Sequence, residues 1–359
     1  MPTTLNWFLP LQTDGAQVGT WPPEGAEPSL THLTAVVQTA EAAGFSGLLV
    51  PVSLGNHLET WTAATAALAT TRTAKTIIAV RPNLVHPVMA AKLTHSLSQL
   101  FPGRIALNIV TGAWPSEDAA TGVQDTHDER YARLREWLAI FDGLWSRAGT
   151  REPFDFTGET YRVVGASLYP YAGARPEIYF SGASPEALTT ATAHADVQLL
   201  WMDTEDIVEG QIEHIRRTFE RAGREVRFSL RSHVLVRPTE EEAMRAADHL
   251  IARLDPAIAE TRLAADPSGS TSKSRQDELT ALGGWLSPHV WTGPGRGRFG
   301  AACAVVGDGQ QVADTLRRYQ ALGVEDFILS GFPKLDEAEL FGRLVTRRLL
   351  DADLQHLRA

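Results

Sequence analysis

Arginine and histidine side chains that could bind an anion occur in the second half of the chain. Arg231 and His233 lie two residues apart in the apolar stretch 226–236, so a strand would place both on the same side. Arg298 follows in a Gly-rich stretch. Guanidinium groups pair bidentately with planar oxygens, which suits the two arginines to an oxyanion of the sulfonate type. Alternatively, Arg231 neutralises a nearby carboxylate, and His233 is a satisfied core residue.

A second group of polar residues stands where apolar stretches end. Asn108 lies inside the stretch 104–112, RIALNIVTG. A buried amide costs free energy unless it is hydrogen-bonded, so Asn108 is either a satisfied core residue or a ligand contact. The turn 181–184, SGAS, precedes a proline, and free N–H groups at such a helix start could bind a phosphate. Trp201 is either core packing or one wall of a pocket for a flat ring.

The sequence gives little support for hydrolysis or metal chemistry. It contains no Ser-His-Asp or HEXXH arrangement, and Cys303 is the only cysteine. Glu59 and Asp203 are the acidic candidates near strand ends, and both resemble acids at helix N-termini. Since the remaining polar residues have no obvious reaction of their own, we expect an externally supplied cofactor.

The composition indicates a soluble protein that acts on a small molecule. The 359 residues are 43% hydrophobic, enough for a large core, and the net charge is −10. No run of Lys or Arg indicates a nucleic-acid or membrane partner. No apolar segment approaches the roughly 18 residues of a membrane span. Because the N-terminus lacks the features of a signal peptide, we expect a cytoplasmic location.

Strand-like and helix-like stretches alternate eight times along the chain. Eight such units favour a closed (β/α)8 TIM barrel over an open doubly wound sheet, and we expect a single domain over 1–359. The active site of such a barrel lies at the carboxyl ends of its strands. The strands are expected at 5–9, 48–50, 75–80, within 104–112, and at 178–180, 197–200, 226–236 and 327–329.

Two segments depart from the alternation. Residues 113–129 show no periodicity and are expected to form a loop, except that Thr126 and Glu129 have capping-box spacing and open a helix to about 148. Residues 255–287 are long for a connection and rich in Ser, Asp and Gly at their centre. We interpret them as either a disordered insertion or a lid that orders on binding.

The motifs, taken in order over nearly the whole chain, resemble the bacterial luciferase-like flavin monooxygenases, and among them the alkanesulfonate monooxygenases. The segments that carry the resemblance are NWFLP (6–10), RPNLVHPVMAAK (81–92), LNIVTG (107–112), HDERY (127–131), IYFSGASPEA (178–187), LRSHVLVR (230–237), GDGQQVA (307–313) and FILSGFP (327–333).

The resemblance implies a TIM barrel that receives reduced FMN from a separate NAD(P)H-dependent flavin reductase. With O2 it would oxygenate an organosulfonate, whose C–S bond then breaks to give an aldehyde and sulfite. It also implies a mobile lid over 255–287 and a homo-oligomer, dimer or tetramer, without a nucleic-acid or membrane partner. No metal is implied.

The resemblance also assigns roles to individual residues. The cofactor-binding residues would be Asn108, Thr111, Tyr131, Ser181, Gly182, Ser184 and Trp201. The substrate-binding residues would be Trp201, Arg231, His233, Arg298, Gln12, His57 and Phe332, with His233, Arg298 and Arg231 catalytic.

Four positions differ from the alkanesulfonate pattern. Gln12 replaces a histidine, and His57 stands near the family's cysteine in a loop one residue longer. Phe332 replaces a tyrosine, and Lys334 replaces a histidine. The alternatives are therefore a different substrate (a sulfone, amine, aminocarboxylate or heterocycle), a non-catalytic flavin-binding protein, or use of a deazaflavin.

Overall fold

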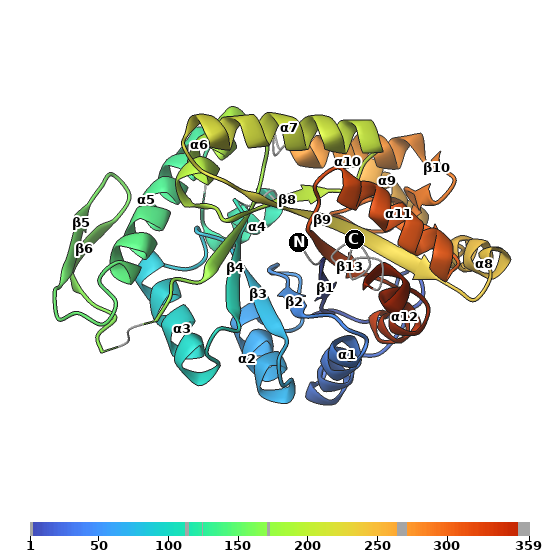
Figure 1. Ribbon diagram of the computed structural model, residues 1–359, viewed down its shortest axis with the longest axis horizontal. Helices are drawn as coiled ribbons and strands as arrows, with labels where there is room; N and C mark the ends of the chain where they lie inside the picture. The colour runs from blue at the N-terminus through green and yellow to red at the C-terminus, as the bar shows by residue number, and fades with distance from the viewer. Residues whose placement is uncertain (1–2, 112–114, 124, 171–172, 264–270, 351–359) are drawn as a thin grey trace, which may run out of the picture.

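The computed structural model describes residues 3–111, 115–123, 125–170, 173–263 and 271–350. At its centre, eight parallel strands close into a barrel (Figure 1), which confirms the predicted (β/α)8 fold. Each coincides with one of the eight predicted stretches. In barrel order they are β1 (Thr4–Phe8), β2 (Gly47–Val50), β3 (Lys75–Val80), β4 (Ile105–Ile109), β7 (Glu177–Ser181), β8 (Val197–Trp201), β9 (Arg227–Val236) and β13 (Asp326–Ser330), which pairs with β1.

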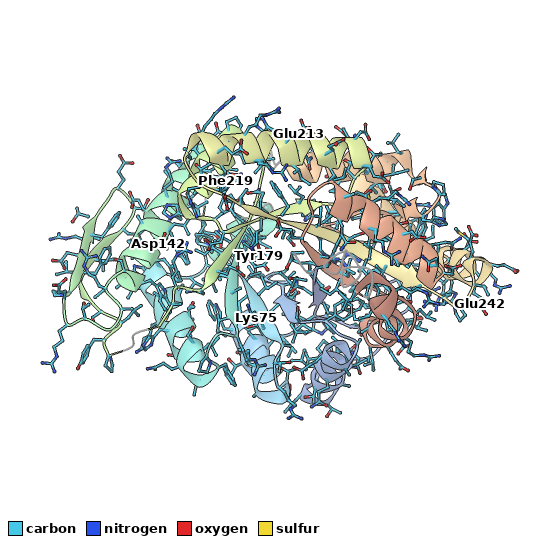
Figure 2. The ribbon with its side chains drawn as sticks, in the orientation of Figure 1. Lys75, Asp142, Tyr179, Glu213, Phe219 and Glu242 are labelled. Carbon is cyan, nitrogen blue, oxygen red and sulfur yellow. The ribbon has the colours of Figure 1, made fainter. Side chains whose placement is uncertain are left out.

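Helices surround the barrel, and each helix packs one of its faces against the strands (Figure 1). On α7, Phe219 is fully buried, whereas Glu213 points outward (Figure 2). The predicted capping box of Thr126 and Glu129 is confirmed at the start of α5. The helices are α1 (Leu30–Ala42), α2 (Thr60–Thr70), α3 (Pro87–Leu100), α5 (His127–Trp145), α6 (Pro185–His194), α7 (Glu205–Arg221), α8 (Glu240–Leu250), α11 (Gly309–Ala321) and α12 (Lys334–Phe341).

Alternate residues of the strands fill the barrel interior. An apolar cluster there contains Ala106 of β4, Tyr179 of β7 and Leu199 of β8. Below it, toward the amino ends of the strands, Asp326 accepts hydrogen bonds from Asn6 at 2.8 Å and from Tyr179 at 3.1 Å. Since side chains alternate across a strand, Asn108, Ser181, Trp201 and Arg231 share this inward face near the carboxyl ends.

Strand β9 is twice as long as most of its neighbours and carries an extension of the barrel sheet. Its first half pairs with β8 and β13 in the barrel, and from His233 onward it pairs with β12 (Ala304–Gly307). Strand β12 pairs antiparallel with β11 (Val290–Trp291), which in turn pairs antiparallel with β10 (Trp285–Ser287). The short 3-10 helix η1 (Gly293–Arg296) and the loop that carries Arg298 lie between β11 and β12. Pairing of β12 with β9 therefore brings Arg298 to the barrel mouth.

Two predictions about irregular segments need correction. Within the expected loop 113–129, residues 115–121 form a helix, α4 (Pro115–Thr121), while 113–114 and 124 lie outside the described residues. This helix is held by Glu117, whose Oε1 accepts from Oγ of Ser53 at 2.5 Å and from N of Leu54 at 2.9 Å. A seven-residue helix fixed by such distant partners leaves no periodic pattern in the sequence.

The segment 255–287 is also more regular than a disordered insertion. It contains α9 (Pro256–Leu263) and α10 (Thr271–Leu282), and residues 264–270 lie outside the described part. Leu279 and Gln276 of α10 are buried, so this helix packs against the body of the protein. The disordered alternative is wrong for the two helices, and movement of the segment as a lid stays a prediction.

A hairpin of β5 (Phe154–Thr157) and β6 (Arg162–Ala166) projects beside α5 (Figure 1). It lies outside the barrel sheet and was not expected from the sequence. None of the helices in the described ranges is long and apolar enough to cross a membrane.

Candidate active site at the carboxyl end of the barrel

Asn108 points into the barrel near the carboxyl end of β4. In the sheet it pairs with Ala79 and Tyr179 on the two neighbouring strands. The residue is 5% exposed, and its Oδ1 has no hydrogen-bond partner among the described residues. Among the described residues this favours the ligand contact over the satisfied core asparagine. Because an unpaired buried amide oxygen costs about 1–3 kcal/mol, this atom fits a hydrogen-bond donor on a ligand.

The turn 181–184 joins β7 to α6 and lies beside Tyr131 of α5. Gly182 has φ +136°, and a Cβ at this position would lie 3.0 Å from Cβ of Ala187 and 3.7 Å from Oη of Tyr131. Ser184 caps α6, since its hydroxyl accepts a hydrogen bond from N of Ala187 at 3.2 Å. The structure thus brings together the turn and the phenol that were predicted to hold a phosphate, at a helix N-terminus.

A hydrogen-bonded chain connects Arg231 with His233. Nη2 of Arg231 donates to Oγ of Ser330 at 2.7 Å, and Nη1 donates to two main-chain carbonyls. Oγ of Ser330 lies 2.8 Å from Nδ1 of His233, whose Nε2 lies 3.1 Å from the carbonyl oxygen of Ala301. A carbonyl only accepts, so Nε2 carries the proton and Nδ1 accepts from Ser330. With the described residues the guanidinium uses three of its five donors, which leaves two for a ligand.

Three cations converge around two aromatic rings at the mouth of the barrel. Cζ of Arg231 lies 4.6 Å and Cζ of Arg298 5.8 Å from the centroid of the Phe8 ring. Arg298 also lies 5.7 Å from the centroid of the Phe332 ring, and Nζ of Lys334 lies 5.2 Å from it. We call Arg231, Arg298 and Lys334 the basic cluster. Arg231 and Arg298 both lie near the Phe8 ring, and Arg298 and Lys334 both lie near the Phe332 ring.

In the basic cluster Arg231 and Lys334 are buried and Arg298 is half-buried, and the cluster is poorly neutralised. In the described part of the chain, neither Arg231 nor Arg298 forms an ion pair, which contradicts the alternative that Arg231 neutralises a carboxylate. Burial, with Arg298 nearby, lowers the pKa of Arg231 well below its usual range. Burial and the three cations lower the pKa of His233, so its ring is neutral at pH 7. Together these features suit an anionic ligand.

Helices α9 and α10 hold the loop that carries Arg298. Nε of Arg262 on α9 donates to the carbonyl oxygen of Arg298 at 2.8 Å. On α10, Oε1 of Gln276 accepts from N of Ala302 at 2.8 Å. Arg275 of the same helix binds both oxygens of Asp203, which follows β8. The segment predicted to be a lid therefore positions one member of the basic cluster.

Other predicted substrate contacts occupy the rim. Gln12 and His57 are exposed in adjacent loops, where Nε2 of Gln12 donates to the carbonyl oxygen of Gly55 at 3.2 Å and His57 lies 3.5 Å from Glu27. No contact within the described ranges connects them to the basic cluster, and their role stays a prediction. Trp201 ends β8 directly opposite Arg231 in the sheet, at the mouth.

Thr111 lies partly exposed just after β4. The two acidic candidates are helix N-terminal acids, as interpreted from the sequence. Glu59 caps α2 by accepting from the main-chain N of Trp61 and Thr62. Asp203 lies two residues before α7 and accepts from N of Thr204, the N-cap residue, at 2.7 Å.

Sequence reasoning missed four residues of the site. Phe8 and Arg262 were not singled out, and Lys334 was noted only as a replacement for a histidine. Gln198, fully buried, fixes the turn after β7 because its Nε2 donates to the carbonyl oxygen of Gly182 at 2.7 Å. A lone polar residue in the apolar stretch 197–200 was the signal that could have found Gln198.

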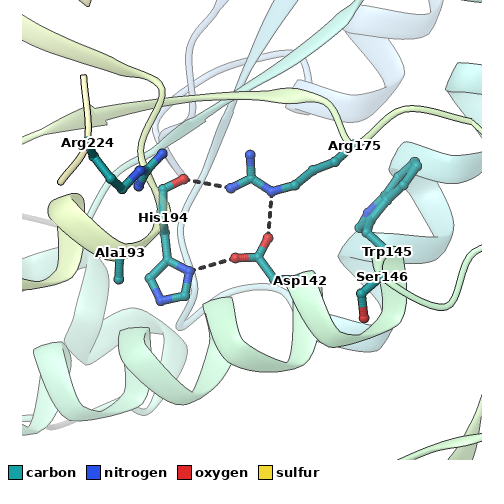
Figure 3. A pocket seen from close by; sticks show the side chains of 7 residues that line it. All are labelled: Asp142, Trp145, Ser146, Arg175, Ala193, His194 and Arg224. Atoms are coloured by element: carbon teal, nitrogen blue, oxygen red, sulfur yellow. Dashed lines mark hydrogen bonds and ion pairs between the residues drawn. The ribbon is translucent and has the colours of Figure 1, made fainter. Parts of the chain in front are cut away.

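A separate pocket of about 340 Å³ lies at the other end of the strands (Figure 3). Arg175, which precedes β7, binds Asp142 at 2.6 Å and Asp196 at 2.8 Å. His194 lies 2.6 Å from the same Asp142. Each of these charges has a partner, so the pocket is a paired network that joins α5, α6 and β7, and it is distinct from the site at the mouth.

Comparison with known proteins identifies the family. The model of the luciferase-like monooxygenase family matches residues 5–326. Solved structures with the same fold include DmoA from Hyphomicrobium sulfonivorans (TM-score 0.80, 20% identity, covering 98% of this chain and 89% of that one). EDTA monooxygenase (EmoA) from Chelativorans sp. BNC1 is equally similar (TM-score 0.79, 20% identity, 98% and 94% covered). So is long-chain alkane monooxygenase (LadA; TM-score 0.79, 20% identity, 98% and 92% covered). Because the family match spans almost the whole barrel, the chain belongs to the luciferase-like monooxygenase family.

Proposed function

We propose that the protein is the oxygenase of a two-component system that desulfonates an organosulfonate with reduced FMN and O2. A separate NAD(P)H-dependent flavin reductase would supply the reduced FMN. The overall reaction converts RCH2SO3⁻, O2 and the two hydrogens of reduced FMN to an aldehyde, hydrogen sulfite, water and oxidised FMN. The observation that carries the proposal is the pair of arginines at the barrel mouth, buried Arg231 and half-buried Arg298, which have no carboxylate partner among the described residues.

The residues at the mouth fit a flavin. The unpartnered Oδ1 of Asn108 supports a bond to a donor on the ring, and the turn 181–184 with Tyr131 supports phosphate binding. Thr111 and Trp201 complete the predicted set. When bound, the reduced flavin supplies the electrons that activate O2.

The chain's own residues bind and orient the substrate. The two free donors of Arg231 and the Nη groups of Arg298 would hold the sulfonate oxygens. The Phe8 and Phe332 rings between the cations exclude water from this region. His233 enters the proposal as a positioning residue, because Ser330 and Ala301 already occupy both ring nitrogens. Its role as a proton donor stays a prediction.

Sulfite release tests the proposal. Purified protein, a flavin reductase, NADH, FMN and O2 should release sulfite from at least one member of a panel of short, long, aromatic and sugar sulfonates. Arg298→Ala should lower kcat/KM by at least about tenfold, the loss of one charged hydrogen bond. Arg296→Ala, which removes an exposed arginine two residues away, is the matched control and should stay within about twofold. Absence of sulfite from every sulfonate rejects the substrate class.

A second substrate class is favoured by the same arginines. Carboxylates also pair bidentately with guanidinium groups, and one protein of similar fold is an EDTA monooxygenase. Oxygenation of an aminocarboxylate would release an aldehyde and an amine without sulfite. Aldehyde and sulfite should therefore be measured together. Tight binding of oxidised FMN without substrate-dependent O2 consumption would instead indicate a non-catalytic flavin-binding protein.

A further inference from the structure

Lys334 is the outermost member of the basic cluster, and its role is unassigned. It is the first residue of α12, follows Phe332-Pro333 at the end of β13, and is 8% exposed. Its ammonium shares the Phe332 ring with Arg298, and Arg298 shares the Phe8 ring with Arg231. The three cations therefore form a row from inside the barrel to its mouth, with aromatic rings between them.

Asp14 is the carboxylate next to Lys334, and its oxygens are occupied by other donors. Oδ1 accepts from the main-chain N of Lys334 at 2.8 Å, and Oδ2 lies 3.0 Å from Nε2 of His32. Nζ of Lys334 lies 3.6 Å from Oδ1, which is an ion pair beyond hydrogen-bond length. In the described residues the ammonium donates no hydrogen bond, so its three N–H groups remain for a ligand.

The charges around the row do not balance. Two buried acids of the described part are already occupied: Asp203 binds Arg275, and Glu337 binds Arg237. Asp14 neutralises one of the three cations, and His233 is neutral, so two positive charges have no carboxylate partner among the described residues. A single sulfonate carries one negative charge and leaves one cation of the row unpaired.

Burial makes this imbalance costly when no anion is bound. Burial, opposed by Asp14 and reinforced by Arg298 and Arg231, lowers the pKa of Lys334 to about 8. Burial with Arg262 nearby lowers the pKa of Arg298 to about 10. Both groups stay protonated at pH 7, and a ligand with two negative charges would recover the lost solvation.

We propose that the substrate carries a second anionic group, a carboxylate or sulfonate, which Lys334 binds. Arg231 holds the reacting sulfonate, and Arg298, which lies between the other two cations, contacts both groups. This inference rests on the proposed desulfonation. The Phe8 and Phe332 rings line the space between the cations, so a short carbon chain joins the two groups. Lys334 thereby acts as a specificity-determining residue.

Paired substrates that differ in one charge test the inference. With reduced FMN and O2, 3-sulfopropanoate should show a kcat/KM at least about tenfold above that of propane-1-sulfonate, because one charged group gains a charged partner. Lys334→Met should reduce this ratio to near one, and Lys334→Arg should retain most of it. Lys92→Met makes the same substitution at an exposed position of α3 and should leave the ratio unchanged.

A double variant separates substrate binding from a purely structural role. Lys334→Met alone leaves Asp14 without its nearby ammonium and could weaken folding. In Asp14→Asn/Lys334→Met both charges are removed, and an amide oxygen can still accept from the main-chain N at 334. If Lys334 only neutralises Asp14, the double variant recovers the preference for the dianion. If Lys334 binds substrate, the preference stays lost.

Direct binding distinguishes failure of this inference from failure of the proposed function. Ethane-1,2-disulfonate should raise the melting temperature of the flavin-free protein more than ethanesulfonate does at equal ionic strength, and Lys334→Met should remove the difference. If 3-sulfopropanoate and propane-1-sulfonate release sulfite with equal kcat/KM, the inference is overturned and the desulfonation stands. Equal shifts of the melting temperature by ethane-1,2-disulfonate and ethanesulfonate lead to the same conclusion. A shift specific to the disulfonate without sulfite from any sulfonate supports the dianion site and rejects the reaction.

Discussion

Arg275 ties α10 to the mouth of the barrel, and its removal should loosen the segment that positions Arg298. Its Nε donates to Oδ2 of Asp203 at 2.6 Å, and its Nη2 donates to Oδ1 at 3.0 Å. The Asp203 side chain is 2% exposed, whereas that of Arg275 is 36% exposed. Arg275→Gln would leave a buried carboxylate with the single remaining bond from N of Thr204.

The expected loss follows from the two hydrogen bonds. Each bond between charged groups stabilises by about 1.5–3 kcal/mol. Solvent around the partly exposed arginine reduces the sum of about 3–6 kcal/mol by about half, to about 1.5–3 kcal/mol. Since about 1.4 kcal/mol corresponds to a factor of ten, local opening of α10 should become about 10–150 times more frequent.

Hydrogen–deuterium exchange measures this opening peptide by peptide. In Arg275→Gln, the amides of α10 should exchange about 10–150 times faster, while those of the barrel strands keep their rates. The kcat/KM for substrate should fall, because Gln276 of α10 holds the loop after Arg298 through N of Ala302.

Glu278→Gln is the matched control on the same arginine. Glu278 pairs with Arg275 at 3.2 Å, but its side chain is 64% exposed, so this ion pair contributes little. Exchange in α10 should change less than about threefold. Unchanged exchange in Arg275→Gln, or an equal effect of both substitutions, would refute the assignment of Asp203 and Arg275 as the connection between lid and barrel.

Two further predictions concern stability. Asn108→Leu should raise the free energy of unfolding of the flavin-free protein, measured in urea, by about 1–2 kcal/mol, since it removes an unpartnered buried oxygen. The same substitution should weaken FMN binding. As a control, Asn6→Leu breaks a 2.8 Å hydrogen bond to Asp326 and should lower the free energy of unfolding. Glu41 is partly buried, but main-chain N–H groups of 72–74 hold its pKa at about 2 instead of 4.5. The ionised Glu41 therefore stabilises the fold fully above about pH 4.5, and this contribution is lost as the pH falls toward about 2. Glu41→Gln should lower the free energy of unfolding by about 1–2 kcal/mol at pH 7 and by little at about pH 2. An equal loss at both pH values would contradict the role of the ionised carboxylate.

Local sequence pattern predicted much of the fold because each strand and helix carries its own periodicity. The eight barrel strands and the capping box at Thr126 required no knowledge of distant contacts. Helix α4 and strands β10–β12 escaped prediction because they are short and gain stability from partners far along the chain. A seven-residue helix or a two-residue strand has too few positions for a period to appear.

The sequence by itself determined which residue types stand at the strand ends: Asn108, the turn 181–184, Trp201, Arg231 and His233. Tertiary structure decided what each one contacts. Pairing of β13 with β1 and of β12 with β9 gathers three cations, Arg231, Arg298 and Lys334, around the rings of Phe8 and Phe332. Among the described residues, this closure leaves a buried amide oxygen without a hydrogen bond and two guanidinium groups without a carboxylate. Hydrogen bonding and neutralisation depend on neighbours in space and not on neighbours in sequence.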